Sequence, residues 1–172
     1  MGLIAVLGLA KIESLVKNKF SLTVLSMFRF YFFTTMVEAS YRLHLVLFGI
    51  RPPVCFDEPW KSVTVAEFWG QRWNLSIAGQ LRNIFFKPLA EAGQRKLGEL
   101  SVFLASSALH MIPIVTLGGS RQGIISTACF FAVQPFVIAF EKQFGLTGRA
   151  WVQAALWSTA PLFALPLYEV TS

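Results

Sequence analysis

An isolated histidine in an apolar stretch is the first residue that could carry chemistry in this sequence. His110 lies in residues 100–117, which contain no Asp, Glu, Lys or Arg. A helix beginning near Gly98 would place His110 about 18 Å along its axis, past the middle of a membrane's hydrocarbon core. An ionisable side chain at that depth is a functional candidate by default, and a structural histidine is the alternative. A neutral imidazole there could act as a general base toward an alcohol.

The sequence around His110 does not match a metal site. No second histidine or carboxylate lies three or four residues away, so the spacing of zinc ligands is absent. The chain also lacks the glycine motifs that bind nucleotides and dinucleotides. Cys55 and Cys129 have no base near them in sequence, and we interpret them as ordinary small residues. We therefore predict no metal and no bound cofactor.

A second candidate is the aromatic and polar cluster EFWGQRWN at residues 67–74. Trp69 and Trp73 are four residues apart and would share one face of a helix. An aromatic anchor at the membrane interface is the simpler interpretation of such a pair. Arg72 and Asn74 lie beside the two indoles, so the anchors would hold their polar ends at a fixed depth. A headgroup or a polar cofactor tail would meet the membrane at that depth.

Three C-terminal stretches are predicted to be helices that cross the membrane and position His110. Residues 100–117, 122–140 and 150–168 each hold 18 or 19 residues without a charged side chain. At 1.5 Å per residue each is long enough to cross a core of about 30 Å. The connections between them are short, so neighbouring spans should be antiparallel.

The N-terminal part is less regular. Residues 20–50 are mostly apolar but contain Glu38, Arg42 and His44, which a membrane helix would keep away from lipid. We predict one long span there, with a kink or break near Glu38 left open. Residues 1–10 are apolar, but Lys11 follows too soon for a full span, and a signal peptide is not predicted.

The overall composition is that of a membrane protein. Of 172 residues, 55% are hydrophobic and 14% are charged, whereas soluble domains carry about 25% charged residues. These values argue against a disordered chain, and two cysteines are too few for a disulfide scaffold. The net charge is +6, but the basic residues flank apolar stretches instead of forming one run. We therefore predict that the chain contacts membrane lipids and does not bind nucleic acid.

Residues 51–97 are the polar exception and divide the chain into three parts. Residues 1–50 would form an N-terminal membrane segment, residues 51–97 a cytosolic or interfacial loop, and residues 98–172 a three-helix membrane segment. The loop carries seven Lys or Arg residues, which places it on the cytosolic side together with residues 141–149. Apolar spacing at 63–77 predicts an amphipathic interfacial helix. The predicted fold is all-α, a polytopic helical membrane protein with about four transmembrane helices.

Four short segments, taken in order, resemble the wax-synthase branch of the membrane-bound O-acyltransferase superfamily. These are FWGQRWN at 68–74, Leu-Arg at 81–82, Phe-Lys-Pro at 86–88 and Ser-Ala-Leu-His at 107–110. The resemblance implies an acyl-CoA-dependent O-acyltransferase with His110 and Asn74 as catalytic residues. It implies substrate-binding roles for a group of aromatic and basic residues, namely Trp69, Arg72, Trp73, Arg82 and Lys87.

The resemblance also implies the substrates. Acyl-CoA, acetyl or longer, would be the cosubstrate, and a lipophilic alcohol such as a terpenoid metabolite or fatty alcohol the acceptor. Similarity of the motif to fungal members favours a small acyl donor and a secondary-metabolite acceptor. The protein would be an integral, multi-pass protein of the endoplasmic reticulum, and no oligomeric state is predicted.

Two alternatives are left open. One is a non-catalytic transport or scaffold protein, in which Glu38, Arg42, His44 and His110 would line a polar path. The other is an inactive fragment of an acyltransferase, because members of that superfamily have several more spans before this region. A shared cavity for Asn74 and His110 would favour the enzyme over the polar path.

Overall fold

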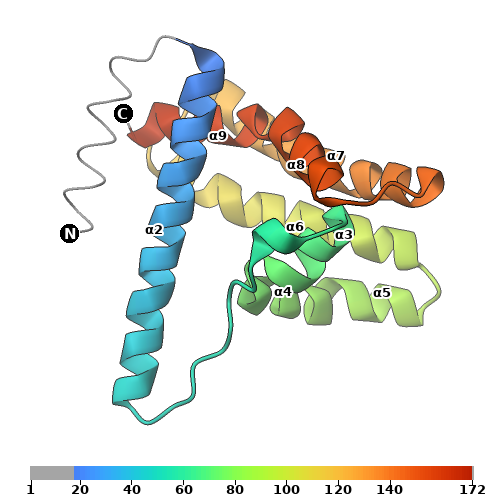
Figure 1. The fold of residues 1–172 in the computed structure, drawn as a ribbon, viewed down its shortest axis with the longest axis horizontal. Coiled ribbons are helices and arrows are strands. Elements are labelled where there is room, and N and C mark those ends of the chain that lie inside the picture. The colour runs from blue at the N-terminus through green and yellow to red at the C-terminus, as the bar shows by residue number, and fades with distance from the viewer. Residues whose placement is uncertain (1–17, 172) are drawn as a thin grey trace.

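Three long apolar helices dominate the computed structural model, which describes residues 18–171. They are α2 (Lys19–Leu47), α6 (Arg95–Thr116) and α7 (Arg121–Phe144), and each is long and apolar enough to cross a membrane. Helices α6 and α7 pack as an antiparallel pair, and α2 runs across this layer near one end (Figure 1). The described residues contain no strand, so the prediction of an all-α polytopic membrane protein is confirmed.

Helix α2 is continuous through the polar residues where a kink had been left open. It starts at Asn18, whose side chain accepts a hydrogen bond from the Phe20 backbone N–H at 2.9 Å. Glu38 and Arg42 form an ion pair one turn apart at 3.5 Å, and Arg42 also donates to the Pro53 carbonyl at 3.1 Å. These side chains thus have partners within the chain, and α2 contains no proline or glycine at which it would kink. The predictions for residues 1–10 and for Lys11 lie outside the described residues.

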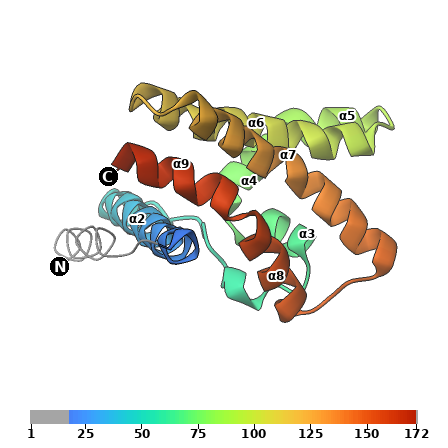
Figure 2. The same cartoon turned by 90° about the horizontal axis from the view of Figure 1, so that it is seen from above.

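The last predicted span is bent into two short helices. Residues 150–168 fall in α8 (Arg149–Thr159) and α9 (Pro161–Thr171), and the chain changes direction between them (Figure 2). Pro161 has no N–H to donate to the preceding turn, which ends α8. Each helix has 11 residues, about 16 Å, which is too short to cross the core alone. Helix α9 instead packs against α7 and α2.

The segment between α2 and α6 folds as a series of short helices, several of which run along α6 (Figure 1). A single helix over 63–77 was the wrong prediction, because Trp73 and Asn74 interrupt it. The elements, of which η2 and η3 are π-helical turns, are η1 (Pro59–Lys61), α3 (Val65–Glu67), η2 (Phe68–Arg72), α4 (Leu75–Leu81), η3 (Arg82–Phe86) and α5 (Lys87–Glu91).

The core lies where α3 and η2 meet α6, α7 and the α8–α9 pair. One cluster of buried side chains joins Val65, Ile138 and Ala155, and a second joins three phenylalanines of α7 and α9. Trp69 packs against both clusters, so the motif segment is part of the core. The Gly148 backbone N–H donates to the Val63 carbonyl at 2.8 Å, which brings the two basic loops together at one end of the molecule.

Candidate functional site

His110 and Asn74 line the same cavity, which has a volume of about 450 Å³. Its walls come from α2, from the segment between α2 and α6, from α6 and α7, and from the α8–α9 pair. Four of its lining residues have polar side chains that could bind a substrate: the amides of Asn74 and Gln153, the hydroxyl of Ser106 and the imidazole of His110. Half of the 24 lining residues are aromatic: Phe28, Phe30, Tyr31, Trp60, Phe68, Trp69, Trp73, Phe103, Phe130, Phe131, Trp157 and Phe163.

The tautomer of His110 follows from its hydrogen bond within α6. Its Nδ1 lies 2.8 Å from the Ser106 carbonyl oxygen. A carbonyl only accepts, so Nδ1 carries the proton and Nε2 keeps the lone pair in the neutral ring. Rings of Phe131 and Phe163 pack around the imidazole, with centroids at 4.6 and 5.5 Å. Nε2 has no hydrogen-bond partner among residues 18–171, so it is free to accept a proton from a hydroxyl in the cavity.

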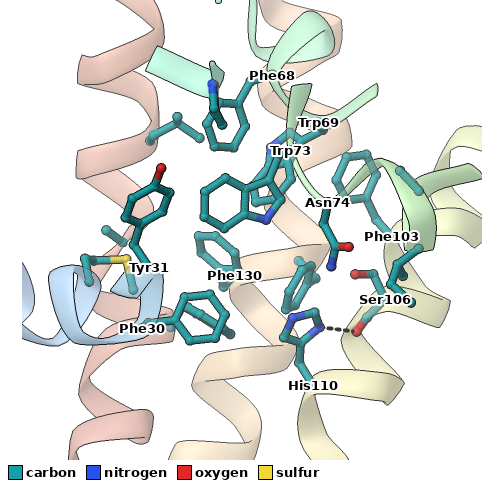
Figure 3. A pocket seen from close by; sticks show the side chains of 18 of the residues that line it. Phe30, Tyr31, Phe68, Trp69, Trp73, Asn74, Phe103, Ser106, His110 and Phe130 are labelled. Carbon is teal, nitrogen blue, oxygen red and sulfur yellow. Dashed lines mark hydrogen bonds between the residues drawn. The ribbon is translucent and has the colours of Figure 1, made fainter. Parts of the chain in front are cut away.

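Asn74 is held in a left-handed backbone conformation, with φ of 45° and ψ of 55°. Asparagine tolerates this conformation better than most residues. The chain is fixed just beyond it, where the Leu75 N–H donates to the Cys55 carbonyl at 2.8 Å. Although Asn74 is the N-cap of α4, its side chain makes no capping bond. The amide instead points toward Ser106 and His110 (Figure 3).

The two indoles of the motif lie in the cavity wall. Trp69 and Trp73 have ring centroids 6.5 Å apart, and Phe68 stacks on Trp73 at 5.4 Å. Tyr31 of α2 approaches Trp73 at 6.1 Å from the other side. The interfacial-anchor interpretation therefore does not describe these two residues, because they face an interior space lined by other rings (Figure 3).

Arg72 lies in an ion-pair network outside the cavity lining. Its Nε donates to Glu67 at 2.7 Å, and Nη1 donates to the Asp57 carbonyl at 3.1 Å. The pKa of the Glu67 carboxyl is lowered mainly because the carboxylate accepts a hydrogen bond from the Val63 backbone N–H. A second hydrogen bond, from the Arg72 side chain, lowers the pKa further. The same bond raises the pKa of Arg72. Arg72 thus supports the motif loop, and its predicted contact with substrate stays a prediction.

The other two cations predicted to bind substrate are also outside the cavity lining. Arg82 is exposed on η3, with its guanidinium 3.3 Å from where a Cβ on Gly70 would lie. Lys87 is exposed at the start of α5. Both lie on the basic segment around the motif, and their role as binding residues remains a prediction.

Sequence reasoning missed two polar residues of α7 that hold the motif. Gln134 accepts a hydrogen bond from the Trp69 Nε1–H at 3.1 Å. Glu141 accepts one from the Val65 backbone N–H at 2.6 Å. A polar side chain inside an apolar span needs a hydrogen-bond partner. The position of Gln134 in the apolar stretch 122–140 therefore could have indicated that it bonds to another element. The sequence predicts a loop over residues 141–149, whereas Glu141 lies in the last turn of α7 and is the one carboxylate of that helix.

The polar residues of α2 lie apart from this cavity. Glu38 and Arg42 line a separate hollow together with Pro52. His44 is exposed, and its Nδ1 lies 2.6 Å from the Ser40 carbonyl. Among the described residues these groups do not join His110 in a continuous polar path.

Comparison with known proteins finds a family to which the region of this site is similar. Residues 52–133 match the model of the membrane bound O-acyl transferase family, and this range includes both Asn74 and His110. No solved structure matches the chain.

Curated relatives agree with the family match. A probable long-chain-alcohol O-fatty-acyltransferase of Arabidopsis thaliana is 31% identical over 41% of this chain and 23% of its own length. The acyl-CoA–sterol O-acyltransferase 1 of the same plant is 26% identical over 50% of this chain and 27% of its own. A peptidoglycan O-acetyltransferase of Helicobacter pylori is 23% identical over 62% of this chain and 23% of its own. The chain spans about a quarter of the length of these relatives, and over residues 52–133 it is similar to the membrane bound O-acyl transferase family.

Proposed function

We propose that this chain carries the reaction centre of an acyl-CoA-dependent O-acyltransferase of the endoplasmic reticulum membrane. The acceptor would be a lipophilic alcohol, such as a terpenoid metabolite or a fatty alcohol. The observation that carries the proposal is the shared cavity of His110 and Asn74, residues 36 positions apart in sequence. Both groups keep unused hydrogen-bonding capacity inside a largely apolar cavity, in which half of the lining residues are aromatic.

The proposed reaction uses His110 Nε2 as the general base. It would take the proton of the acceptor hydroxyl as that oxygen attacks the thioester carbonyl carbon of acyl-CoA. The Asn74 amide would donate a hydrogen bond to the oxyanion of the tetrahedral intermediate. Collapse of the intermediate breaks the C–S bond, and the protonated imidazole returns its proton to the leaving thiolate. The products are an ester and free CoA.

The lining of the cavity supports a lipophilic acceptor. Rigid aromatic rings present apolar surface and lose little conformational entropy when they bind. The basic residues of the motif segment, Arg82 and Lys87 among them, are suited to the phosphates of the CoA headgroup. The names of the relatives include both long-chain and acetyl transfer. We favour a small acyl donor, on the likeness of the motif to fungal members.

An acyl-transfer assay on membranes containing the full chain tests the proposal. Donors from acetyl-CoA to palmitoyl-CoA are each combined with fatty alcohols and hydroxylated terpenoids, and ester formation is measured by mass spectrometry. His110→Ala should lower transfer by about 100- to 10,000-fold, because it removes the general base. His44→Ala is the matched control, since His44 bonds to its own helix in the same way but is exposed on α2. Transfer that survives His110→Ala, or no ester from any pair, would contradict the proposal.

A further inference from the structure

Gln134 is a buried amide in the middle of α7 that connects three elements. Its side chain is 1% exposed. Its Oε1 accepts the Trp69 indole N–H, and its Nε2 donates to the Phe130 carbonyl and to Thr159 Oγ1, both at 3.2 Å. Trp69 belongs to the motif and Thr159 to the end of α8. An amide in an apolar span that is bonded in this way fixes the position of its partners.

Glu141 is a buried carboxylate two turns further along α7. It is 3% exposed, and its Oε2 accepts the Val65 backbone N–H at 2.6 Å and the Trp151 indole N–H at 2.8 Å. The Ala66 N–H points to its other oxygen at 3.4 Å. The first free N–H groups of a helical segment favour a negative charge, and charged acceptors make the stronger hydrogen bonds. Glu141 therefore fixes the start of the segment that carries the motif.

These two side chains act on the same segment. They are seven residues apart and so project from one face of α7. Glu141 holds the start of α3, and Gln134 holds Trp69 one turn later, after which η2 leads through Trp73 to Asn74. Helix α7 in turn packs along α6, which carries His110.

We infer that Gln134 and Glu141 are positioning residues that set the Asn74 amide against His110 for the reaction. This inference rests on the proposed function, because it assigns a role within that reaction. Neither side chain lines the cavity, so neither touches the substrates. Loss of either contact should let the motif segment move relative to α6 while the cavity walls stay in place.

The inference predicts a specific kinetic pattern. A displacement of about 1 Å in a reacting geometry can lower a rate on the order of 100-fold. Glu141→Ala and Gln134→Leu should each lower kcat by about 10- to 100-fold, with the donor KM changed less than about twofold. Glu141→Gln keeps an acceptor oxygen for Val65 and Trp151, so it should recover most of the lost kcat.

Two residues supply matched controls. Glu99 on α6 forms an exposed ion pair with Lys142 at 3.2 Å, so Glu99→Ala removes a carboxylate outside the motif. Gln143 is an exposed glutamine of α7, so Gln143→Leu repeats the other substitution away from the motif. Both controls should retain the kcat of the wild-type chain.

A measurement without turnover separates this inference from the proposed function. Hydrogen exchange of the full chain in nanodiscs, followed by mass spectrometry, reports on backbone amides in residues 63–74. Glu141→Ala and Gln134→Leu should speed exchange there by about tenfold or more while peptides of α6 stay protected. Glu141→Gln and both controls should exchange like wild type. If wild type makes no ester with any donor but exchange responds as expected, the proposed function fails and the structural part of the inference stands. Unchanged exchange in Glu141→Ala and Gln134→Leu, or unchanged kcat in an active chain, would overturn the inference.

Discussion

At the scale of residues, His110 and Asn74 stand out because each presents to the cavity a polar group without a partner in the described part of the chain. Nε2 of His110 and the side-chain amide of Asn74 both face a largely apolar cavity, and neither has a hydrogen-bond partner among residues 18–171. Asn74 also has a left-handed backbone, which is uncommon outside glycine although asparagine tolerates it better than most residues. An uncommon backbone conformation and unused hydrogen-bonding capacity at one place are typical of a functional site.

Substitution of Asn74 by glycine tests the role of the side-chain amide separately from that of the left-handed backbone. Glycine adopts the left-handed conformation freely, so Asn74→Gly should fold like wild type while it loses the proposed oxyanion donor. We expect kcat for acyl transfer to fall by about 100- to 1000-fold, with the melting temperature in detergent retained.

Glu58 is the control for this substitution, because it is the other non-glycine residue with positive φ among residues 18–171. It lies outside the cavity lining, so Glu58→Gly should keep full activity. An active Asn74→Gly chain would show that Asn74 serves only the turn.

At the scale of elements, a close approach between η3 and α6 determines how the motif segment lies along the His110 helix. A Cβ on Gly98 would lie 3.0 Å from Phe86 Cδ2 and 3.1 Å from the Phe86 carbonyl oxygen. The second contact is with backbone, so side-chain rotation cannot relieve it. Gly98 therefore permits this packing because of its size and not because of its backbone angles.

Gly98→Ala should destabilise the protein by about 1–3 kcal/mol, because overpacking forces η3 away from α6. Thermal unfolding in detergent should show a lower midpoint than wild type. Gly79→Ala is the comparison, since a Cβ on Gly79 in α4 would have nothing within 4 Å. That variant should be stabilised by up to about 1 kcal/mol, because alanine favours the helix. Equal midpoints for the two variants would contradict the packing argument.

The pair of Glu67 and Arg72 predicts a dependence of stability on pH. The pKa of Glu67 is below its ordinary value of 4.5 in the folded chain. A lowered pKa means that the ionised group stabilises the fold above pH 4.5 and that this contribution is lost as pH falls below that value. Melting temperature measured from pH 7 down to pH 4 and below should therefore fall less steeply in Glu67→Gln than in wild type.

Glu58→Gln provides the control for this prediction, because it removes an exposed pair with Lys61 outside the motif. Its profile should parallel that of wild type. A Glu67→Gln profile as steep as wild type would show that Glu67 does not contribute to the acid sensitivity.

The sequence predicted the long helices well and the interruptions poorly. Runs without charge located α6 and α7, and a mostly apolar stretch located α2, because length and hydropathy suffice to identify a span. The same criterion overlooked Pro161, since one proline lowers the mean hydropathy of an apolar run only slightly even though it ends a helix. The spacing of Trp69 and Trp73 suggested one helical face, whereas the bonds that shape η2 and the turn at Asn74 involve residues of other elements.

At the scale of the whole molecule, the cavity exists only where distant segments meet. Phe30 of α2 packs edge to face on Phe163 of α9 at 5.1 Å, and Phe163 in turn packs on His110 at 5.5 Å. The sequence could nominate His110 and Asn74 because each stands out in its local context. It could not reveal Gln134 and Glu141 as partners of the motif, because their contacts join residues 65 and 76 positions apart.

The α2 wall should set the size of the acceptor. Phe30 faces the cavity, whereas Phe33 on the same helix is 61% exposed and does not line it. Phe30→Ala removes a ring from the wall without touching His110 or Asn74, so it should admit bulkier alcohols. We expect the ratio of kcat/KM for a ring-bearing acceptor to that for a short linear one to rise by about tenfold, a typical change for altered apolar contacts in a pocket.

The measurement is a competition assay in which both acceptors are present at once and the two esters are quantified together. Phe33→Ala should keep the wild-type ratio, because its ring lies outside the cavity lining. The same shift in both variants would indicate a general loosening of α2, and no shift in Phe30→Ala would show that the acceptor does not occupy this part of the cavity. A shift confined to Phe30→Ala would place the acceptor between α2 and the His110 helix, on the side of the imidazole where Phe163 lies.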